Sequence, residues 1–186
     1  QAQKNVTVFA TNNASEENFR KLNGCKLNII HVATHGFYNK YKNTSGQMNN
    51  AIDENVLLKS GLVFSNVNTN SGNSKNDGIL NSFEISQMDL SNVDLVVLSA
   101  CETGLGDIKG SEGVFGLVRA FKLAGAKSMI VSLWQISDVS TSELMVHFYE
   151  FYLQGFSKKD SLKKAQEIVK NKYQSPYYWA GFVLLE

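Results

Sequence analysis

The chain has 186 residues, 43% of them hydrophobic, which is enough for one globular domain with a buried core. Its 18 Lys and Arg residues against 17 Asp and Glu residues leave a net charge of +1, without the basic stripe that nucleic-acid binding requires. The 2 cysteines exclude a disulfide framework, and no Cys or His spacing suggests zinc or another metal, so we expect no cofactor.

The apolar runs are far shorter than the roughly 20 residues that cross a bilayer, and no signal peptide is visible at the start of the chain. We therefore expect a cytoplasmic protein with free thiols that binds neither membrane nor nucleic acid. Because the chain begins at Gln1 without an initiator Met, we also expect a piece of a longer protein.

Apolar runs bounded by turn residues predict buried strands, and segments of helical periodicity alternate with them. The predicted strands are 6–9, 27–33, 95–100, 127–133 and 181–185. The predicted helices are 13–22, 112–124, a segment that follows Asp138, and 158–172. This alternation predicts an α/β fold with a mostly parallel sheet between two layers of helices.

The segment between residues 37 and 78 is more polar, and its Asn- and Ser-rich pieces 37–54 and 65–78 are predicted surface loops. Between them, 56–58 and 62–64 flank Ser60 and Gly61, a pattern that predicts a small β-hairpin.

Two reactive side chains directly follow predicted strands. His35 follows the strand 27–33, and Cys101 follows the strand 95–100. Open α/β sheets place their sites at the carboxyl ends of strands. If these two strands are neighbours, the imidazole and the thiol face each other across the edge of the sheet.

Such a pair has a recognisable chemistry. An imidazole favours the thiolate form of a cysteine and later protonates a leaving amine. The helix near Glu112 would add a modest electrostatic contribution through its N-terminal end. Gly36 leaves its backbone N–H unobstructed, so it can join the N–H of Cys101 as an oxyanion hole.

Spacing alone leaves other interpretations open. A cysteine at a strand end can be a small buried hydrophobe, and a single histidine can be structural. The glycines that follow Cys101 also resemble a phosphate-binding turn, although Lys109 stands where the dinucleotide motif requires glycine. A nucleotide-binding domain is therefore a second, weaker hypothesis.

Several motifs together give the chain its resemblance to a known family. They are His31–Gly36, Ser60–Val63, 77–80, 96–104, 113–117, 124–126, 132–134 and 176–180. With these motifs the chain resembles the CHAT domain, a bacterial caspase-like module often found with tetratricopeptide repeats, and is more distantly similar to separase.

The resemblance implies a caspase-like α/β sandwich over residues 1–186, with the most N-terminal elements missing. It implies a cysteine endopeptidase with the dyad His35 and Cys101, a peptide or protein substrate, and control by an upstream or partner region such as tetratricopeptide repeats. A caspase-like scaffold without activity is the alternative, because fold does not determine function.

The resemblance also suggests substrate-binding residues. Ser132 and Trp134 follow the predicted strand 127–133 and would pair with an extended peptide. Asp138 matches the separase acid that selects a basic residue before the cleaved bond, but an Asp at this place can also be a helix N-cap. Of the remaining candidates, we expect His31 to be packed and Cys25 to be an unreactive thiol.

Overall fold

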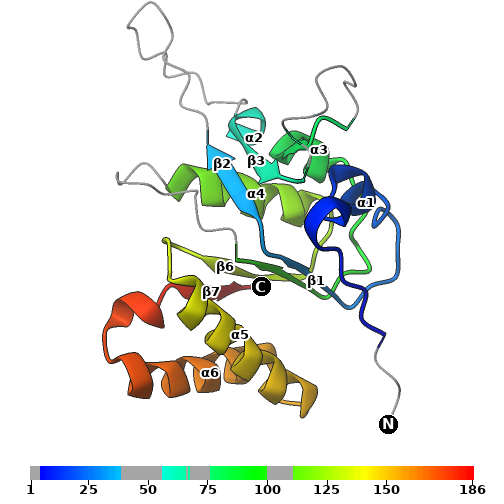
Figure 1. Cartoon of the computed structure of the whole chain (residues 1–186). Coiled ribbons are helices and arrows are strands. Elements are labelled where there is room, and N and C mark those ends of the chain that lie inside the picture. Colours follow the sequence, from blue (N-terminus) through cyan, green and yellow to red (C-terminus); the bar gives the residue numbers. More distant parts are fainter. Residues whose placement is uncertain (1–4, 39–55, 66, 68–75, 100–110) are drawn as a thin grey trace, which may run out of the picture.

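The computed structural model describes residues 5–38, 56–65, 67, 76–99 and 111–186. In this part of the chain, a four-stranded sheet lies between helices that cover its two faces (Figure 1). The strands in spatial order are β1 (Ile29–Val32), β5 (Leu95–Leu98), β6 (Ser128–Ser132) and β7 (Phe182–Leu185). β1, β5 and β6 are parallel and β7 is antiparallel, which confirms the predicted α/β fold with a mostly parallel sheet.

The central strand β5 has all four side chains buried, as expected for a strand covered on both faces. Because successive side chains point to opposite faces, Val96 and Leu98 join one hydrophobic cluster, whereas Leu95 and Val97 join another. One core cluster therefore lies on each face of the same sheet.

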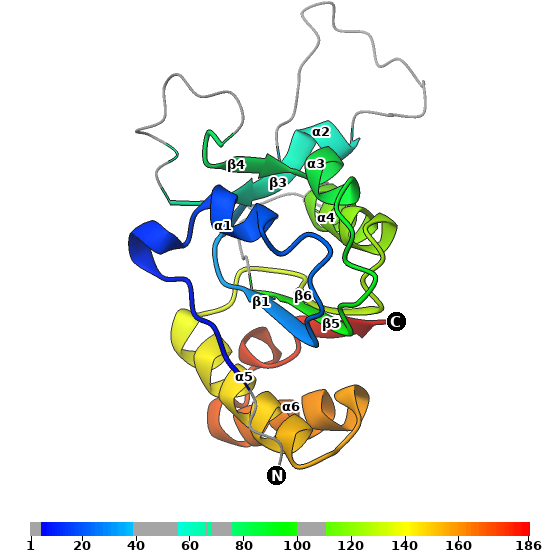
Figure 2. The same cartoon turned by 90° about the vertical axis from the view of Figure 1, so that its right-hand side faces the viewer.

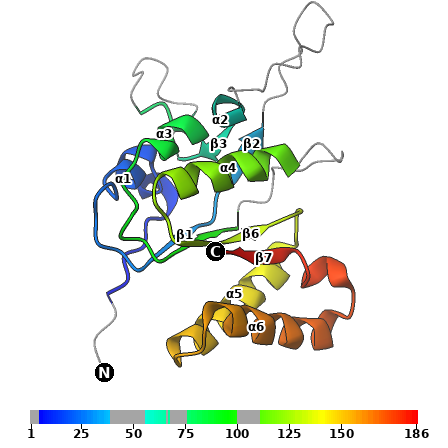
Figure 3. The ribbon, with the colours of Figure 1, turned by 180° about the vertical axis from the view of Figure 1, so that it is seen from behind.

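The helices divide between these two faces. α4 (Ser111–Leu123) lies on one face, and α5 (Asp138–Leu153) and α6 (Lys158–Tyr173) lie on the other, as Figures 1 and 3 both show. The three predictions for these helices are confirmed within one or two residues. Gly125 follows α4 with φ of 98°, a left-handed conformation that glycine adopts without strain and that ends the helix.

A second, antiparallel sheet was not predicted. It comprises β2 (His35–Tyr38), β3 (Ser60–Val63) and β4 (Ile79–Asn81), with β3 in the middle. The predicted hairpin is wrong, because the chain forms the short helix α2 (Val56–Lys59) where its first strand was expected. The reason is tertiary: Leu57 packs on the core cluster of the α4 face, and β3 pairs with two strands from elsewhere in the chain.

The predicted strand 6–9 is also wrong. These residues form no regular element, and the side chains of Val6 and Val8 are 81% and 76% exposed. An isolated strand is not stable in water, so an alternating apolar pattern remains extended coil where no strand pairs with it.

The chain then forms the short 3₁₀ helix η1 (Thr11–Asn13) and the helix α1 (Glu16–Arg20). The N-cap of α1 is Ser15, whose hydroxyl accepts from the N–H of Asn18, so the helix begins later and ends earlier than the predicted 13–22. α1 lies on the same side of the large sheet as α4 (Figure 2).

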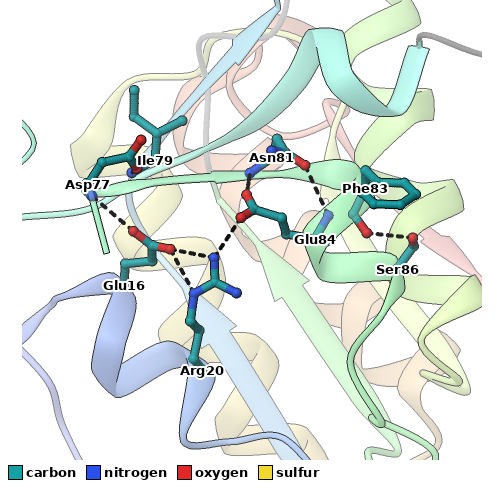
Figure 4. A network of polar contacts seen from close by, with 9 residues as sticks. Glu16, Arg20, Asp77, Ile79, Asn81, Phe83, Glu84 and Ser86 are labelled. Atoms are coloured by element: carbon teal, nitrogen blue, oxygen red, sulfur yellow. Dashed lines mark hydrogen bonds and ion pairs between the residues drawn. The ribbon is translucent and has the colours of Figure 1, made fainter. Parts of the chain in front are cut away.

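A network of charged side chains attaches α1 to the second sheet (Figure 4). Arg20 bridges the carboxylates of Glu16 and Glu84 at 2.6 and 2.7 Å. Glu16, which is 2% exposed, also accepts a 2.9 Å hydrogen bond from the N–H of Gly78. Glu84 and Asn81 form a capping box at the start of the helix α3 (Ser82–Ser86).

None of the helices in the described segments combines the length and the apolar composition that crossing a bilayer requires.

Candidate active site

The strands that precede His35 and Cys101 are neighbours in the sheet. β1 and β5 are paired in parallel, and their last paired residues are Val32 and Leu98. His35 and Cys101 each come three residues after this pair in the sequence. The condition for bringing the two motifs to one edge of the sheet is therefore met, although Cys101 itself lies outside the described residues.

The backbone of His35 is held by the second sheet. His35 is the first residue of β2, where it stands opposite Val63 of β3 and has an exposed side chain. Directly before it, the hydroxyl of Thr34 donates to the carbonyl oxygen of Val63. The chain thus passes from the large sheet to the small one in two residues, and this crossing fixes the backbone position of His35.

Gly36 is buried in β2 opposite Leu62. The second donor predicted for the oxyanion hole is the N–H of Cys101, which lies outside the described residues. The oxyanion hole therefore stays a prediction.

The predicted substrate strand is held between two neighbours. Ser132 is the last residue of β6, which pairs with β5 on one side and β7 on the other. The N–H of Leu133 donates to Gly181 at 2.8 Å, and the hydroxyl of Ser132 donates to the carbonyl of Trp134 at 2.5 Å. These groups already have partners, so a peptide that adds here would pair with later backbone groups.

Trp134 is partly buried against the C-terminal segment. Its indole N–H donates to the carbonyl of Tyr177 at 3.0 Å, in the 3₁₀ helix η3 (Pro176–Tyr178). Gly181 lies against the same ring, because a Cβ there would be 2.9 Å from the indole. Trp134 therefore lies near the carboxyl end of β6, held in place by the last residues of the chain.

Asp138 is the first residue of α5, and its side chain is exposed. The N-cap interpretation is wrong, because Ser137 occupies the N-cap position. The carboxylate still lies in the first turn, where negative charge is favourable to the helix dipole. Its position after β6 leaves the role in substrate selection as a prediction.

His31 lies in a hydrogen-bonded chain that sequence analysis missed. Its Nδ1 is 3.0 Å from the hydroxyl of Tyr149 in α5, and its Nε2 is 3.4 Å from the hydroxyl of Ser99. The imidazole and the Tyr149 ring are also in contact, with centroids 5.7 Å apart. The alternation of residues 29, 31, 95, 97 and 99 predicts a shared face for His31 and Ser99, but nothing in the sequence identifies Tyr149.

The surroundings of these groups shift their titration. Part of the His31 ring is accessible, yet the protein atoms around it lower the pKa of His31 below that of a free imidazole. Burial likewise raises the pKa of Tyr149 well above its ordinary value. Both shifts favour neutral side chains, so the Tyr149 hydroxyl is protonated and the His31 imidazole is uncharged at neutral pH.

Within the described ranges, no group of three or more His, Cys, Asp or Glu side chains could hold a metal ion. The nucleotide-binding hypothesis depends on Gly104, Gly106 and Gly110, which lie outside these ranges.

A mostly parallel sheet between two helical layers, with the His and Cys motifs after neighbouring strands, is typical of the caspase-like class of α/β proteins. The model of the CHAT domain family matches residues 1–186, and the chain belongs to this family.

Two curated relatives share part of the sequence. Tetratricopeptide repeat protein 28 of Mus musculus is 38% identical over 96 residues, and that of Homo sapiens is 35% identical over 96 residues. The match covers 50% of this chain but 4% of each relative, so this chain corresponds to a small part of those proteins.

Proposed function

We propose that the chain is a cysteine endopeptidase in which Cys101 is the nucleophile and His35 is the acid/base. The observation that carries this proposal is the pairing of Val32 with Leu98, from which both residues are equally distant along the sequence. Membership of the caspase-like CHAT family supports the same assignment. Cys101 comes two residues after Ser99, so its Cα lies within about 7 Å of the Cα of Ser99, which directly follows β5.

The proposed reaction has two stages. His35 accepts the proton of the Cys101 thiol, and the thiolate attacks the carbonyl carbon of the peptide bond. The N–H groups of Gly36 and Cys101 stabilise the oxyanion, and the C–N bond breaks as His35 protonates the leaving amine. His35 then removes a proton from water, whose oxygen attacks the carbonyl carbon of the thioester. The C–S bond breaks, the acid is released, and His35 returns its proton to the Cys101 thiolate.

Replacement of the dyad tests this proposal. In Cys101→Ala and His35→Ala variants, cleavage of a peptide library should fall by about 1,000-fold or more, as for other catalytic nucleophiles and bases. Cys25→Ala is the matched control, since that thiol donates to the carbonyl of Lys21 at 3.2 Å and has no role in the reaction. Cleavage that survives in both dyad variants would refute the assignment.

A caspase-like scaffold without activity is distinguished by labelling. A peptide with a thiol-reactive group should modify Cys101 of the wild-type protein and leave His35→Ala much less modified, since the imidazole promotes the thiolate. Absence of a Cys101 adduct, measured by mass spectrometry with activating partners present, would favour the scaffold.

We further propose that Asp138 selects a basic residue before the cleaved bond. Its exposed carboxylate follows β6 in the sequence, four residues after the proposed substrate-binding residue Trp134. Asp138→Asn should lower kcat/KM for Lys and Arg substrates by roughly tenfold and leave neutral substrates unchanged. Glu167→Gln, an exposed carboxylate of α6, is the control. An equal loss for all substrates would indicate a structural role.

The name of both curated relatives includes tetratricopeptide repeats. We propose that such a region, in the same protein or in a partner, controls access to the site, and that residues 1–186 form a single CHAT domain beside it. Addition of the repeat region should then change the rate of Cys101 labelling.

A further inference from the structure

Three polar side chains meet at the carboxyl edge of the large sheet, on its α5 face. They are Tyr149 of α5, His31 of β1 and Ser99, which directly follows β5. They come from three different elements of the fold, so their contacts tie a helix to two neighbouring strands.

The hydrogen bonds among these three side chains run in one direction, from Tyr149 through His31 to Ser99. We assign the imidazole proton to Nε2, because the hydroxyl of Ser99 donates to the carbonyl of Val32 and can therefore only accept from His31. Nδ1 of the neutral ring then accepts from the hydroxyl of Tyr149 at 3.0 Å. Nε2 lies 3.4 Å from the hydroxyl of Ser99, which in turn donates to the carbonyl of Val32 at 3.4 Å. The last two contacts are long, so the hydrogen bond between Tyr149 and His31 is the strongest of the three.

The carbonyl of Val32 in β1 connects these three side chains to the backbone of the large sheet. The same carbonyl also accepts a 3.0 Å hydrogen bond from the backbone N–H of Ser99. Ser99 is thus bound to Val32 through both backbone and side chain, one residue beyond the last pair of β1 and β5. These contacts hold together the two strand ends that lead to His35 and Cys101.

We infer that Tyr149, His31 and Ser99 are positioning residues for the proposed dyad. They hold the carboxyl ends of β1 and β5 in register, and thereby the starting points of the segments that carry the imidazole and the thiol. The inference rests on the proposed function for the identity of the dyad. The hydrogen-bonded chain itself is independent of it.

Alkylation of Cys101 by iodoacetamide tests the inference, because the rate depends on the thiol and its surroundings rather than on a substrate. A Cys25→Ser background restricts the reaction to one thiol. Tyr149→Phe and Ser99→Ala should each lower the alkylation rate at neutral pH by about fivefold, the effect of losing one hydrogen bond. Ser99→Thr, which retains the hydroxyl, should restore most of the rate.

Tyr152→Phe is a matched control on the same helix. Its hydroxyl is 3.3 Å from the carboxylate of Asp94, which directly precedes β5 and so lies at the opposite edge of the sheet. This variant should alkylate at the wild-type rate. If Tyr149→Phe and Tyr152→Phe behave alike, or if Ser99→Ala retains the wild-type rate, the inference is overturned.

Two further measurements keep the outcomes separate. The imidazole ¹⁵N shifts of His31 should show a proton on Nε2, and Tyr149→Phe should move the Nδ1 signal. A proton on Nδ1 would contradict the proposed direction of the hydrogen bonds between Tyr149, His31 and Ser99. In peptide cleavage, the variants should lose kcat with an unchanged KM. Wild-type protein that alkylates normally but cleaves no peptide refutes the peptidase proposal, whereas equal alkylation in all variants refutes the positioning role.

Discussion

Gly61 is closely surrounded by its neighbours in the small sheet. It lies in the middle strand β3, between Phe37 of β2 and Asn81 of β4. A Cβ at this position would be 2.5 Å from the carbonyl oxygen of Leu80 and 2.7 Å from both the Asn81 Cα and the Phe37 ring. Two of these three atoms are backbone, so the neighbours cannot move aside by a change of rotamer.

Gly61→Ala should lower the free energy of unfolding by about 1–3 kcal/mol, the usual range for overpacking. It should also reduce peptide cleavage, because β3 supports the strand that begins at His35. Urea denaturation and cleavage kinetics measure the two effects.

Gly24→Ala is the control for backbone strain alone. Gly24 has φ of 71°, but no atom lies within 4 Å of the place that a Cβ would take, so its replacement should cost roughly 1 kcal/mol and leave cleavage unchanged. A Gly61→Ala variant with wild-type stability would show that the two sheet neighbours separate easily.

At the scale of elements, the short helix α1 depends on its charged contacts. It has five residues, too few to be stable without tertiary contacts. Arg20 pairs with Glu84 of α3, whereas Glu16 of the same helix accepts from the N–H of Gly78. Arg20 also pairs with Glu16, which is almost completely buried.

Arg20→Met should destabilise the protein by about 3 kcal/mol, because it leaves the buried Glu16 carboxylate without its counter-ion. Lys21→Met breaks the neighbouring ion pair between Lys21 and Glu17, whose two side chains are 63% and 61% exposed, respectively. This variant should leave the unfolding midpoint unchanged. Chemical denaturation compares the two. Equal effects would mean that burial of Glu16 has no energetic consequence.

Another ion pair joins Asp94, the residue directly before β5, to the first residue of α6. Lys158 lies 2.9 Å from the carboxylate of Asp94, and the hydrogen bond between them lowers the pKa of Asp94. A carboxyl group whose pKa is lower in the folded state stabilises the fold above its unfolded pKa of about 3.9, and this contribution is lost as the pH falls through the folded pKa.

Asp94→Asn should therefore reduce stability at pH 7, by no more than about 1 kcal/mol because the pair is partly exposed and screened by solvent. The difference from wild type should shrink as the pH falls below about 4. Thermal unfolding between pH 7 and pH 3 measures it. A difference that is constant over this range would exclude the charge as its cause.

At the scale of the whole molecule, one sheet joins two hydrophobic clusters. Phe121 of α4 lies in one cluster and Phe148 of α5 in the other, and both are fully buried. Trp134 and Trp179 both pack on the α5 side. Tryptophan fluorescence therefore reports directly on only one of the two faces.

Phe121→Ala should cost about 3–5 kcal/mol and shift the fluorescence and far-UV circular dichroism transitions together, because the shared sheet couples the two faces. Phe115→Ala is the control on the same helix, since this side chain is 65% exposed. A fluorescence midpoint that stays in place while the dichroism midpoint falls would show that the two faces unfold separately.

The local pattern of side chains by itself determined most elements of the large sheet and its helices. Buried strands are read from continuous apolar runs, and α4, α5 and α6 from helical periodicity, because both patterns record which faces are covered. The same pattern identified His35 and Cys101 as residues that follow strands.

The tertiary structure decided which strands are neighbours. The pairing of β1 with β5, the second sheet that begins at His35, and the contact of Tyr149 with His31 join residues far apart in sequence. The exposed segment 6–9 and the helix α2 show the same limit, since each departs from its local pattern. A periodicity records burial but not the partner that provides it, so only long-range packing could make β1 and β5 neighbours.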